Sequence, residues 1–219
     1  MSKHKSVWLL CLALMLEIIA IGVLVPGDWT GRVISKEKQM IQNQLGAQTS
    51  YWIGQTSHRW YQSWIVDTQM EQSVRDFLIP TEEQRLRSKG MENMGGFWFV
   101  WVEDRIQAFF DVLYQVFTRF ALLMVWLPFA LILMLPALWD GLMTWKIKKT
   151  TFDFSSPIIH RYSMIILGSG VILLFMGLFA PLAIPPVVLP SLIIGLALMA
   201  GLALSHLQKK ILGPSGLIL

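Results

Sequence analysis

Four long apolar stretches constrain the fold of this chain more than any other feature of its sequence. They cover residues 7–25, 120–138, 164–184 and 191–207, and each is close to the ~20 residues that a helix needs to cross a bilayer. Charged residues make up only 15% of the chain, whereas soluble domains have about 25%. Because a chain in lipid must satisfy its backbone hydrogen bonds internally, we predict an all-α membrane protein with four transmembrane helices.

The first apolar stretch is preceded by Lys3 and Lys5 and followed by Pro26. A cleavable signal peptide is the alternative, but its apolar core has about 7–15 residues and a small-residue cleavage site follows it. No such site follows residue 25, so we predict an uncleaved membrane anchor. Cys11 within it is the single cysteine, which excludes a disulfide within the chain and a cysteine-based metal site.

Residues 26–115 have a different composition, with nine basic and eleven acidic residues. Between positions 60 and 78, apolar residues recur three or four positions apart, which predicts an amphipathic helix that Pro80 ends. Gly95 and Gly96 are expected to break the chain again before helical spacing resumes. We therefore predict a helical, tryptophan-rich extracytoplasmic region between the first and second membrane helices.

Several tryptophans of this region are predicted to form an extracytoplasmic aromatic face. Two interpretations are open: the rings belong to a core that also contacts the membrane surface, or they form a platform for a protein partner, because tryptophan is enriched at interaction hot spots. The residues are Trp52, Trp60, Trp64, Trp98 and Trp101.

Basic residues near the membrane edges predict the orientation, because lysine and arginine favour the cytoplasmic side. They lie before the first span, between the second and third, and after the fourth, at Lys3, Lys5, Lys146, Lys148, Lys149, Arg161, Lys209 and Lys210. Both termini are therefore predicted to be cytoplasmic. The predicted parts are a cytoplasmic N-terminus with the first membrane helix (1–25), a helical periplasmic region (26–115), a second membrane helix (116–145), a basic cytoplasmic loop (146–163), a membrane hairpin (164–208) and a cytoplasmic tail (209–219).

No pattern of catalytic or metal-binding residues occurs in the sequence. The four histidines lack a second histidine or a carboxylate at metal-ligand spacing, and nucleotide-binding and nucleophile-elbow motifs are missing. We predict no enzymatic activity, no catalytic residues, no cofactor and no metal. Direct nucleic acid binding is not expected either, because the positive charges are scattered along membrane edges instead of forming a stripe.

Two ionisable residues fall within or at the edge of the predicted membrane helices: Glu17 and Arg119. A carboxylate in the membrane is costly unless it is protonated or paired. Glu17 could be a neutral packing residue, could pair with Arg119 or a partner subunit, or could belong to a proton path. A proton path needs more acids at depth, and the last two predicted spans contain none.

The segment 145–162 combines basic, aromatic and proline residues between two apolar spans. Pro157 favours extended backbone at the residue before it, and the Asp-Gly pair at the end of the second span offers a hinge. Contact with anionic lipid headgroups, worth about 1 kcal/mol for each lysine, is the alternative to a docking role. The candidate partner-docking residues are Asp140, Gly141, Lys146, Lys148, Lys149, Ser156, Pro157 and Arg161.

The same segment is similar to the shared core of a family of membrane proteins encoded in bacterial integrating conjugative elements and large conjugative plasmids. The similar residues are WDGL at 139–142, WKIKK at 145–149, FDFSSP at 152–157 and HRY at 160–162. The resemblance covers most of the chain and implies no activity that could be assigned to particular residues. It implies an accessory protein of the bacterial inner membrane that takes part in conjugative DNA transfer by type IV secretion, beside the coupling ATPase.

Two other functions remain open at this point. One is a proton- or solute-conducting membrane subunit that uses Glu17. The other is an exclusion factor, which blocks transfer into a cell that already carries the element, or another regulatory membrane factor acting through the tryptophan-rich part. Small residues in the last two spans, such as Gly170, Gly195 and Gly201, favour close helix packing within the hairpin or with another subunit, so an oligomer is compatible with the sequence.

Overall fold

The computed structural model describes residues 25–79, 92–151 and 156–207, together with nine residues between Trp8 and Leu24. For residues 92–97 and Lys149 the description covers the backbone alone. Across these ranges the secondary structure is helical and contains no strand, which confirms the predicted all-α class. The chain divides into two compact units, Met1–Val125 with Phe175–Leu189, and Trp126–Leu174 with Pro190–Leu219.

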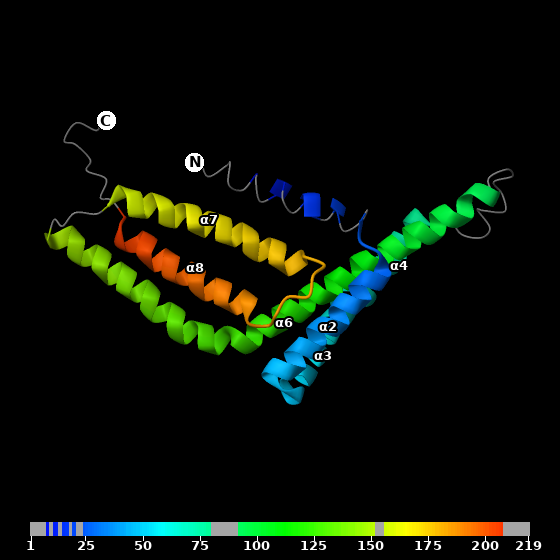
Figure 1. Ribbon diagram of the computed structural model, residues 1–219, viewed down its shortest axis with the longest axis horizontal. Coiled ribbons are helices and arrows are strands. Elements are labelled where there is room, and N and C mark those ends of the chain that lie inside the picture. The colour runs from blue at the N-terminus through cyan, green and yellow to red at the C-terminus, as the bar shows by residue number, and fades with distance from the viewer. Residues whose placement is uncertain are drawn as a thin grey trace. The chain divides into compact units, whose positions relative to one another are not determined.

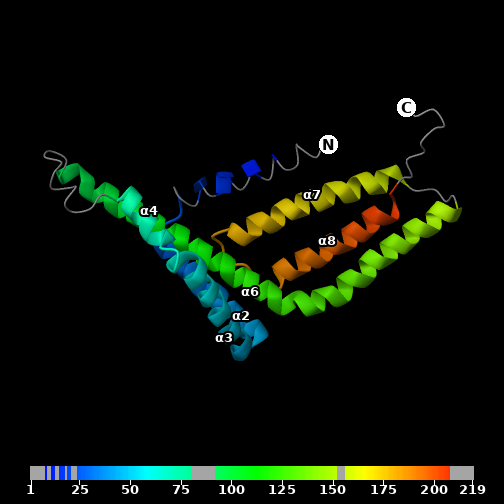
Figure 2. The same cartoon turned by 180° about the vertical axis from the view of Figure 1, so that it is seen from behind.

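In the first unit, short helices lie along the N-terminal half of one long helix (Figures 1 and 2). Helices α2 (Gly27–Leu45) and α3 (Ala47–Tyr61) form a hairpin, which a π-helical turn (Gln62–Val66) and α4 (Met70–Leu78) follow. The hairpin reverses direction at Gly46, whose φ of 87° is strained for any residue with a side chain. Glycine is therefore required at this connection.

A small apolar core holds these elements against the long helix, α6 (Glu92–Thr151). Its buried residues are Ile65 from the π-helical turn, with Ile106 and Phe110 from α6. Burying side chains of this size contributes about 1.5–3 kcal/mol each. Further apolar residues pack around them: Tyr61, Val74, Ile79, Val102, Phe109, Leu113 and Phe117.

The structure corrects the predicted single helix between positions 60 and 78. The π-helical turn and a left-handed Gln69, with φ of 55°, interrupt the helix before α4 begins. A π-helical turn changes the angular register of the residues that follow it, and here both Ile65 and Val74 contact the core. Spacing of three and four positions alone could not reveal this interruption.

Helix α6 is continuous over 60 residues, which corresponds to about 90 Å at ~1.5 Å per residue. It passes through Gly95 and Gly96, so the predicted break at these glycines is wrong. A glycine costs a helix only about 1 kcal/mol relative to alanine, which does not suffice to end one. The helix also contains Pro128 and Pro136. The boundary predicted between residues 115 and 116 falls inside this single helix.

The basic segment predicted as a loop over 146–163 is largely helical. Helix α6 continues to Thr151, and α7 (Pro157–Phe179) begins six residues later. Lys146 and Lys148 therefore lie on α6, and Arg161 lies on α7. No glycine or proline separates Lys146 from Thr151, so the helix has no reason to end where the apolar stretch does.

The second unit consists of the C-terminal half of α6, most of α7 and most of α8 (Val188–Ser205), which lie side by side in both views (Figures 1 and 2). Helices α6 and α8 meet through glycine. A Cβ atom on Gly141 would lie 2.3 Å from the carbonyl oxygen of Gly201, and one on Gly201 would lie 2.5 Å from that of Ala137. Gly201 was predicted to pack within the hairpin or against another subunit, whereas the structure places it against α6.

Among the residues that the structure describes, three helices are long and apolar enough to cross a membrane: Trp98–Lys148, Pro157–Phe179 and Val188–Ser205. The first contains the second predicted span, and the other two overlap the third and fourth predicted spans but end before residues 184 and 207. The first predicted span, residues 7–25, lies mostly outside the described residues, so the total of four spans stays a prediction.

Candidate functional site

A fully buried arginine lies inside the first unit. Arg119 on α6 is 0% exposed, although arginine is almost never fully buried unless it is paired. Its Nη1 donates to the carbonyl oxygens of Gly177, Leu178 and Ala180 at 2.8, 2.8 and 2.9 Å, and its Nη2 donates to that of Leu182 at 2.6 Å. One guanidinium thus binds four main-chain carbonyls, two in the last turn of α7 and two in the segment that joins α7 to α8.

Helical partners are missing for most of these carbonyls because they lie at or just beyond the C-terminal end of α7; that of Ala180 also accepts from the Leu182 amide at 2.8 Å. The last carbonyls of a helix lack partners within the helix, and the negative end of its dipole favours a cation. The connecting segment includes Pro181, Pro185 and Pro186, which have no N–H to donate. The planar guanidinium, with five N–H donors, is suited to bind several acceptors at once.

Glu37 on α2 provides the counter-charge. Its Oε1 accepts from Arg119 Nε at 3.1 Å and its Oε2 accepts from Arg119 Nη2 at 3.4 Å, while Gln115 Nε2 donates to the same Oε2. Glu37 and Gln115 are each 2% exposed. We call Glu37, Gln115 and Arg119, with the four carbonyls that Arg119 binds, the arginine clamp. Breaking a buried pair of this kind by removing one partner costs about 3–5 kcal/mol.

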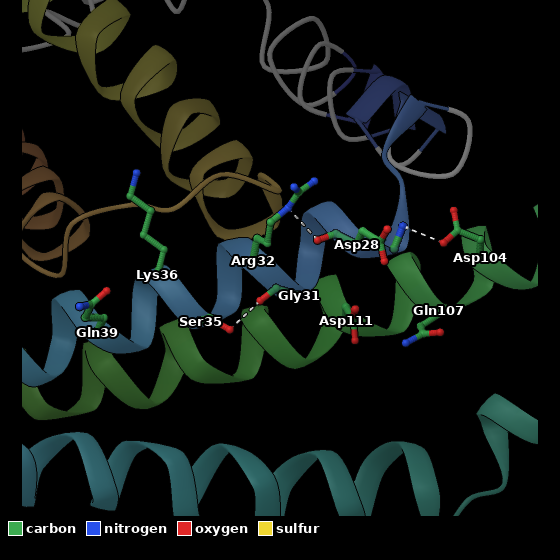
Figure 3. A pocket seen from close by; sticks show the side chains of 10 residues that line it. Asp28, Gly31, Arg32, Ser35, Lys36, Gln39, Asp104, Gln107 and Asp111 are labelled. Atoms are coloured by element: carbon green, nitrogen blue, oxygen red, sulfur yellow. Dashed lines mark hydrogen bonds between the residues drawn. The ribbon is translucent and has the colours of Figure 1, made fainter.

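Two hydrogen bonds attach the N-terminal part of α2 to α6, and Figure 3 shows the one that Asp104 accepts. The Gly27 amide donates to Asp104 Oδ1 at 3.0 Å, and Thr30 Oγ1 donates to Asp111 Oδ2 at 2.7 Å. Together with the Glu37 contact, these bonds show that α2 and α6 run parallel, because both residue numbers increase together. The N-terminal half of α2, up to Glu37, is thus attached to α6 at three points.

A groove of about 610 Å³ lies between α2 and α6, and Figure 3 shows the polar side chains around it. Burial raises the pKa of the Asp111 carboxyl, the hydrogen bond from Thr30 opposes this effect, and the nearby Glu71 carboxylate adds to it. In the part of the chain that the structure describes, no group of three or more histidine, cysteine or acidic residues is placed to hold a metal ion. The lining includes Asp28, Arg32, Ser35, Lys36, Gln39, Asp104, Gln107 and Asp111.

The structure pairs Arg119 with Glu37, a partner that the sequence analysis did not consider. No ion pair joins Arg119 to Glu17, and Oε2 of Glu17 is buried without a hydrogen-bond partner. The prediction of an ion pair between these two residues is therefore not supported. A neutral packing role and a proton-path role for Glu17 stay predictions.

The predicted aromatic residues are distributed over three elements. Trp98 and Trp101 on α6 stack with ring centroids 5.2 Å apart, and the Arg105 guanidinium lies 5.3 Å from the Trp101 ring. Trp52, Trp64 and Trp98 are exposed, and Trp60 is partly buried. Exposed large rings of this kind fit a surface that contacts a protein partner or lipid.

The candidate docking residues separate into packed and exposed ones. Gly141 packs against Gly201 and is not available to a partner. Lys148 Nζ lies 3.4 Å from Nε2 of His206, just beyond α8, and is partly buried. The Ser156 carbonyl accepts from the His160 amide at the start of α7, where Pro157 occupies the first helical position. The side chains of Asp140, Lys146 and Arg161 are exposed, and the side chain of Lys149 is not among those that the structure describes.

Sequence reasoning missed Glu37 and Gln115, although a signal for each was present. The buried residues of α2 are Thr30, Val33, Glu37 and Ile41, so Glu37 occupies a position on the inward stripe where an apolar residue is expected. Gln115 precedes Arg119 by one helical turn, so both face the same side of α6. Two polar residues on buried stripes of two helices are the pattern that predicts such a pair.

A family model described as "IncC plasmid conjugative DNA transfer protein DtrJ-like" matches residues 30–211. The chain belongs to the DtrJ-like family. No curated protein and no solved structure matches it. Membership of the DtrJ-like family confirms the predicted relation to a conjugation-associated family and associates the protein with conjugative DNA transfer.

The DtrJ-like match includes the whole arginine clamp, from Glu37 to the carbonyl of Leu182. It also includes the candidate docking residues from Asp140 to Arg161. Both features therefore lie in the part of the chain that defines the family.

Proposed function

We propose that this DtrJ-like family member is an accessory inner-membrane subunit of a type IV secretion system for conjugative DNA transfer, and that it binds the coupling ATPase. The family match over residues 30–211 is the observation that carries this proposal. Three helices of membrane-spanning length and composition support a location in the membrane. The bias of lysine and arginine supports an orientation with both termini in the cytoplasm.

The proposed docking surface consists of the ends of α6 and α7 that carry the basic residues. Lys146 and Arg161 are exposed there, and exposed apolar side chains accompany them at Ile147, Ile158 and Tyr162. Binding to anionic lipid headgroups requires only the positive charges of this surface. A surface that combines charged and apolar side chains also suits a protein partner, because apolar and aromatic anchors provide much of the affinity of an interface.

Co-purification in detergent with the coupling ATPase of the same element tests this proposal. The test variant carries Lys146→Gln, Lys148→Gln and Lys149→Gln. A matched variant carries Lys3→Gln, Lys5→Gln and Lys209→Gln, which removes the same charge from other segments predicted to be cytoplasmic. Loss of the ATPase from the first variant alone supports docking through the α6 end.

Topology has to be measured in both variants because the same lysines direct membrane orientation. Accessibility of an added C-terminal tag from the cytoplasmic side of inverted vesicles is a sufficient readout. Retention of the ATPase by the correctly oriented test variant would contradict docking through these lysines.

Proton conduction through Glu17 has less support than a docking role. Helices α7 and α8 contain no aspartate or glutamate, so they offer no acid that could continue a path from Glu17. A carboxyl group that transfers protons across a membrane normally works with further ionisable groups at depth.

A further inference from the structure

Helix α2 is attached to the α7–α8 segment at two places. Trp29 Nε1 donates directly to the Pro181 carbonyl at 2.9 Å, and Glu37 acts through Arg119. These two α2 residues are eight positions apart, which is about 12 Å along a helix. Helix α2 is therefore joined to the end of α7 and the connection that follows it at two points, directly at Trp29 and through Arg119 at Glu37.

The arginine clamp favours an all-or-none state. The Arg119 side chain is fully buried, so moving Glu37 away would leave a positive charge unpaired in a medium of low dielectric constant. Moving Arg119 instead would remove the donor of the Gly177 and Leu178 carbonyls, each at a cost of about 1–3 kcal/mol if it stays buried. The other two carbonyls would lose one of two donors, because that of Ala180 also accepts from the Leu182 amide and that of Leu182 also accepts from Gln115 Nε2. At intermediate positions of α2 and Arg119, both the ion pair and the hydrogen bonds to the carbonyls are lost. The clamp is therefore either engaged or released as a whole.

A cavity beside the ion pair provides space for release. It has about 260 Å³, and Glu37 and Gln115 lie in its lining together with the apolar residues Ile34, Ile41 and Ile53. Gln115 Oε1 is buried and has no hydrogen-bond partner. A polar site with unused acceptors and room for several water molecules can be hydrated, which would solvate the separated charges after α2 moves.

We propose that the arginine clamp is a conformational latch that makes the conformation of the α7–α8 segment depend on the position of α2. Through Glu37 and Arg119, a displacement of the extracytoplasmic α2–α3 hairpin releases the connection between two predicted membrane helices. This proposal goes beyond docking of the coupling ATPase, and its test requires no partner protein.

The test measures the reactivity of single cysteines toward N-ethylmaleimide in the full chain, in membranes, with Cys11→Ser as background. Leu189→Cys reports on the start of α8 directly after the α7–α8 segment, because Leu189 is 2% exposed and packs beside Gly177 of α7. Ser57→Cys is the reporter for α3, where Ser57 is 0% exposed and bonds only to the Gly54 carbonyl within its own helix. Labelling of either cysteine requires local opening.

Glu37→Gln is expected to raise the labelling rate of the Leu189→Cys reporter at least about tenfold, which corresponds to ~1.4 kcal/mol of lost protection. The Ser57→Cys reporter should change less than about twofold. Lys38→Gln, at an exposed neighbouring position on α2, is the matched control and should leave both rates unchanged. An unchanged rate at Leu189→Cys, or an equal rise at both reporters, would overturn the latch.

Two further variants separate the latch from a simple ion pair and from general unfolding. Glu37→Arg combined with Arg119→Glu keeps opposite charges, but glutamate has no N–H for the four carbonyls, so the Leu189→Cys reporter should stay reactive. Restoration of the wild-type rate in this variant would contradict the clamp. Arg119→Lys keeps the charge but offers three donors in place of five, and it should raise labelling at Leu189→Cys alone.

Discussion

Gly141→Ala is the substitution whose effect follows most directly from the coordinates of the second unit. The new Cβ would lie 2.3 Å from the Gly201 carbonyl oxygen and 2.8 Å from the carbonyl carbon and Cα of the same residue. All three are main-chain atoms, which cannot rotate away as a flexible side chain can. Helices α6 and α8 must therefore separate by about 1 Å to reach ordinary contact distances.

Overpacking of this kind costs about 1–3 kcal/mol. For a protein of this size, each 1 kcal/mol corresponds to about 2–4 °C in Tm, so the expected loss is about 2–12 °C. Thermal unfolding in mild detergent, followed by circular dichroism and by loss of the monodisperse peak, measures it. Gly201→Ala should behave similarly, because its Cβ would lie 2.5 Å from the Ala137 carbonyl oxygen.

Gly195→Ala on the same α8 helix is the matched control. No atom lies within 4 Å of the Cβ that it adds, and alanine favours a helix over glycine by about 1 kcal/mol. The Tm of this variant should equal or exceed that of the wild type. If Gly141→Ala shows no loss of Tm relative to Gly195→Ala, the close α6–α8 contact is wrong and Gly141 returns to the candidate docking surface.

Three other outcomes are expected. The pKa of Asp111 is raised in the folded state, so the folded first unit binds this proton more tightly than the unfolded chain. Protonated Asp111 therefore adds stability as pH falls through the raised pKa toward about 3.9, and this contribution is lost at higher pH. Asp111→Asn should raise Tm at pH 7 more than at pH 4, and an equal effect at both pH values would contradict the raised pKa. Glu17→Gln should leave conjugative transfer close to wild type if Glu17 is a neutral packing residue, and abolition of transfer would instead support the proton path. Trp29→Phe removes the hydrogen bond to the Pro181 carbonyl and should cost about 1 kcal/mol of unfolding free energy. This loss should be clearly smaller than the loss of unfolding free energy caused by Glu37→Gln. A larger loss in Trp29→Phe than in Glu37→Gln would place the main attachment of α2 at Trp29.

Hydropathy alone predicted three long apolar helices at the last three apolar stretches, because a backbone in lipid must satisfy its hydrogen bonds internally and a helix of that length does so. It was less informative about where each helix ends. Helix α6 extends from Glu92 to Thr151, beyond both limits of its apolar stretch, since polar residues continue a helix as readily as apolar ones. The interruption at Gln62–Val66 was equally hidden, because it depends on how Ile65 meets α6.

The arginine clamp could be predicted only in part. The burial of Glu37 follows from its place on the apolar stripe of α2, and an arginine at the start of an apolar stretch needs a partner. The four carbonyl acceptors carry no side-chain signal, since any residue provides a carbonyl. They lie 58 to 63 positions from Arg119, so only the folded backbone shows that they converge on it.

Transfer frequency in matings is the most direct measurement of the proposed role, with donors that carry a deletion of this gene and are complemented by each variant. The wild type and the variant with Lys3→Gln, Lys5→Gln and Lys209→Gln should restore transfer. The variant with Lys146→Gln, Lys148→Gln and Lys149→Gln should remain near the level of the deletion while its amount and orientation in the membrane stay normal. Full transfer with the latter variant, or wild-type transfer from the deletion itself, would contradict the account.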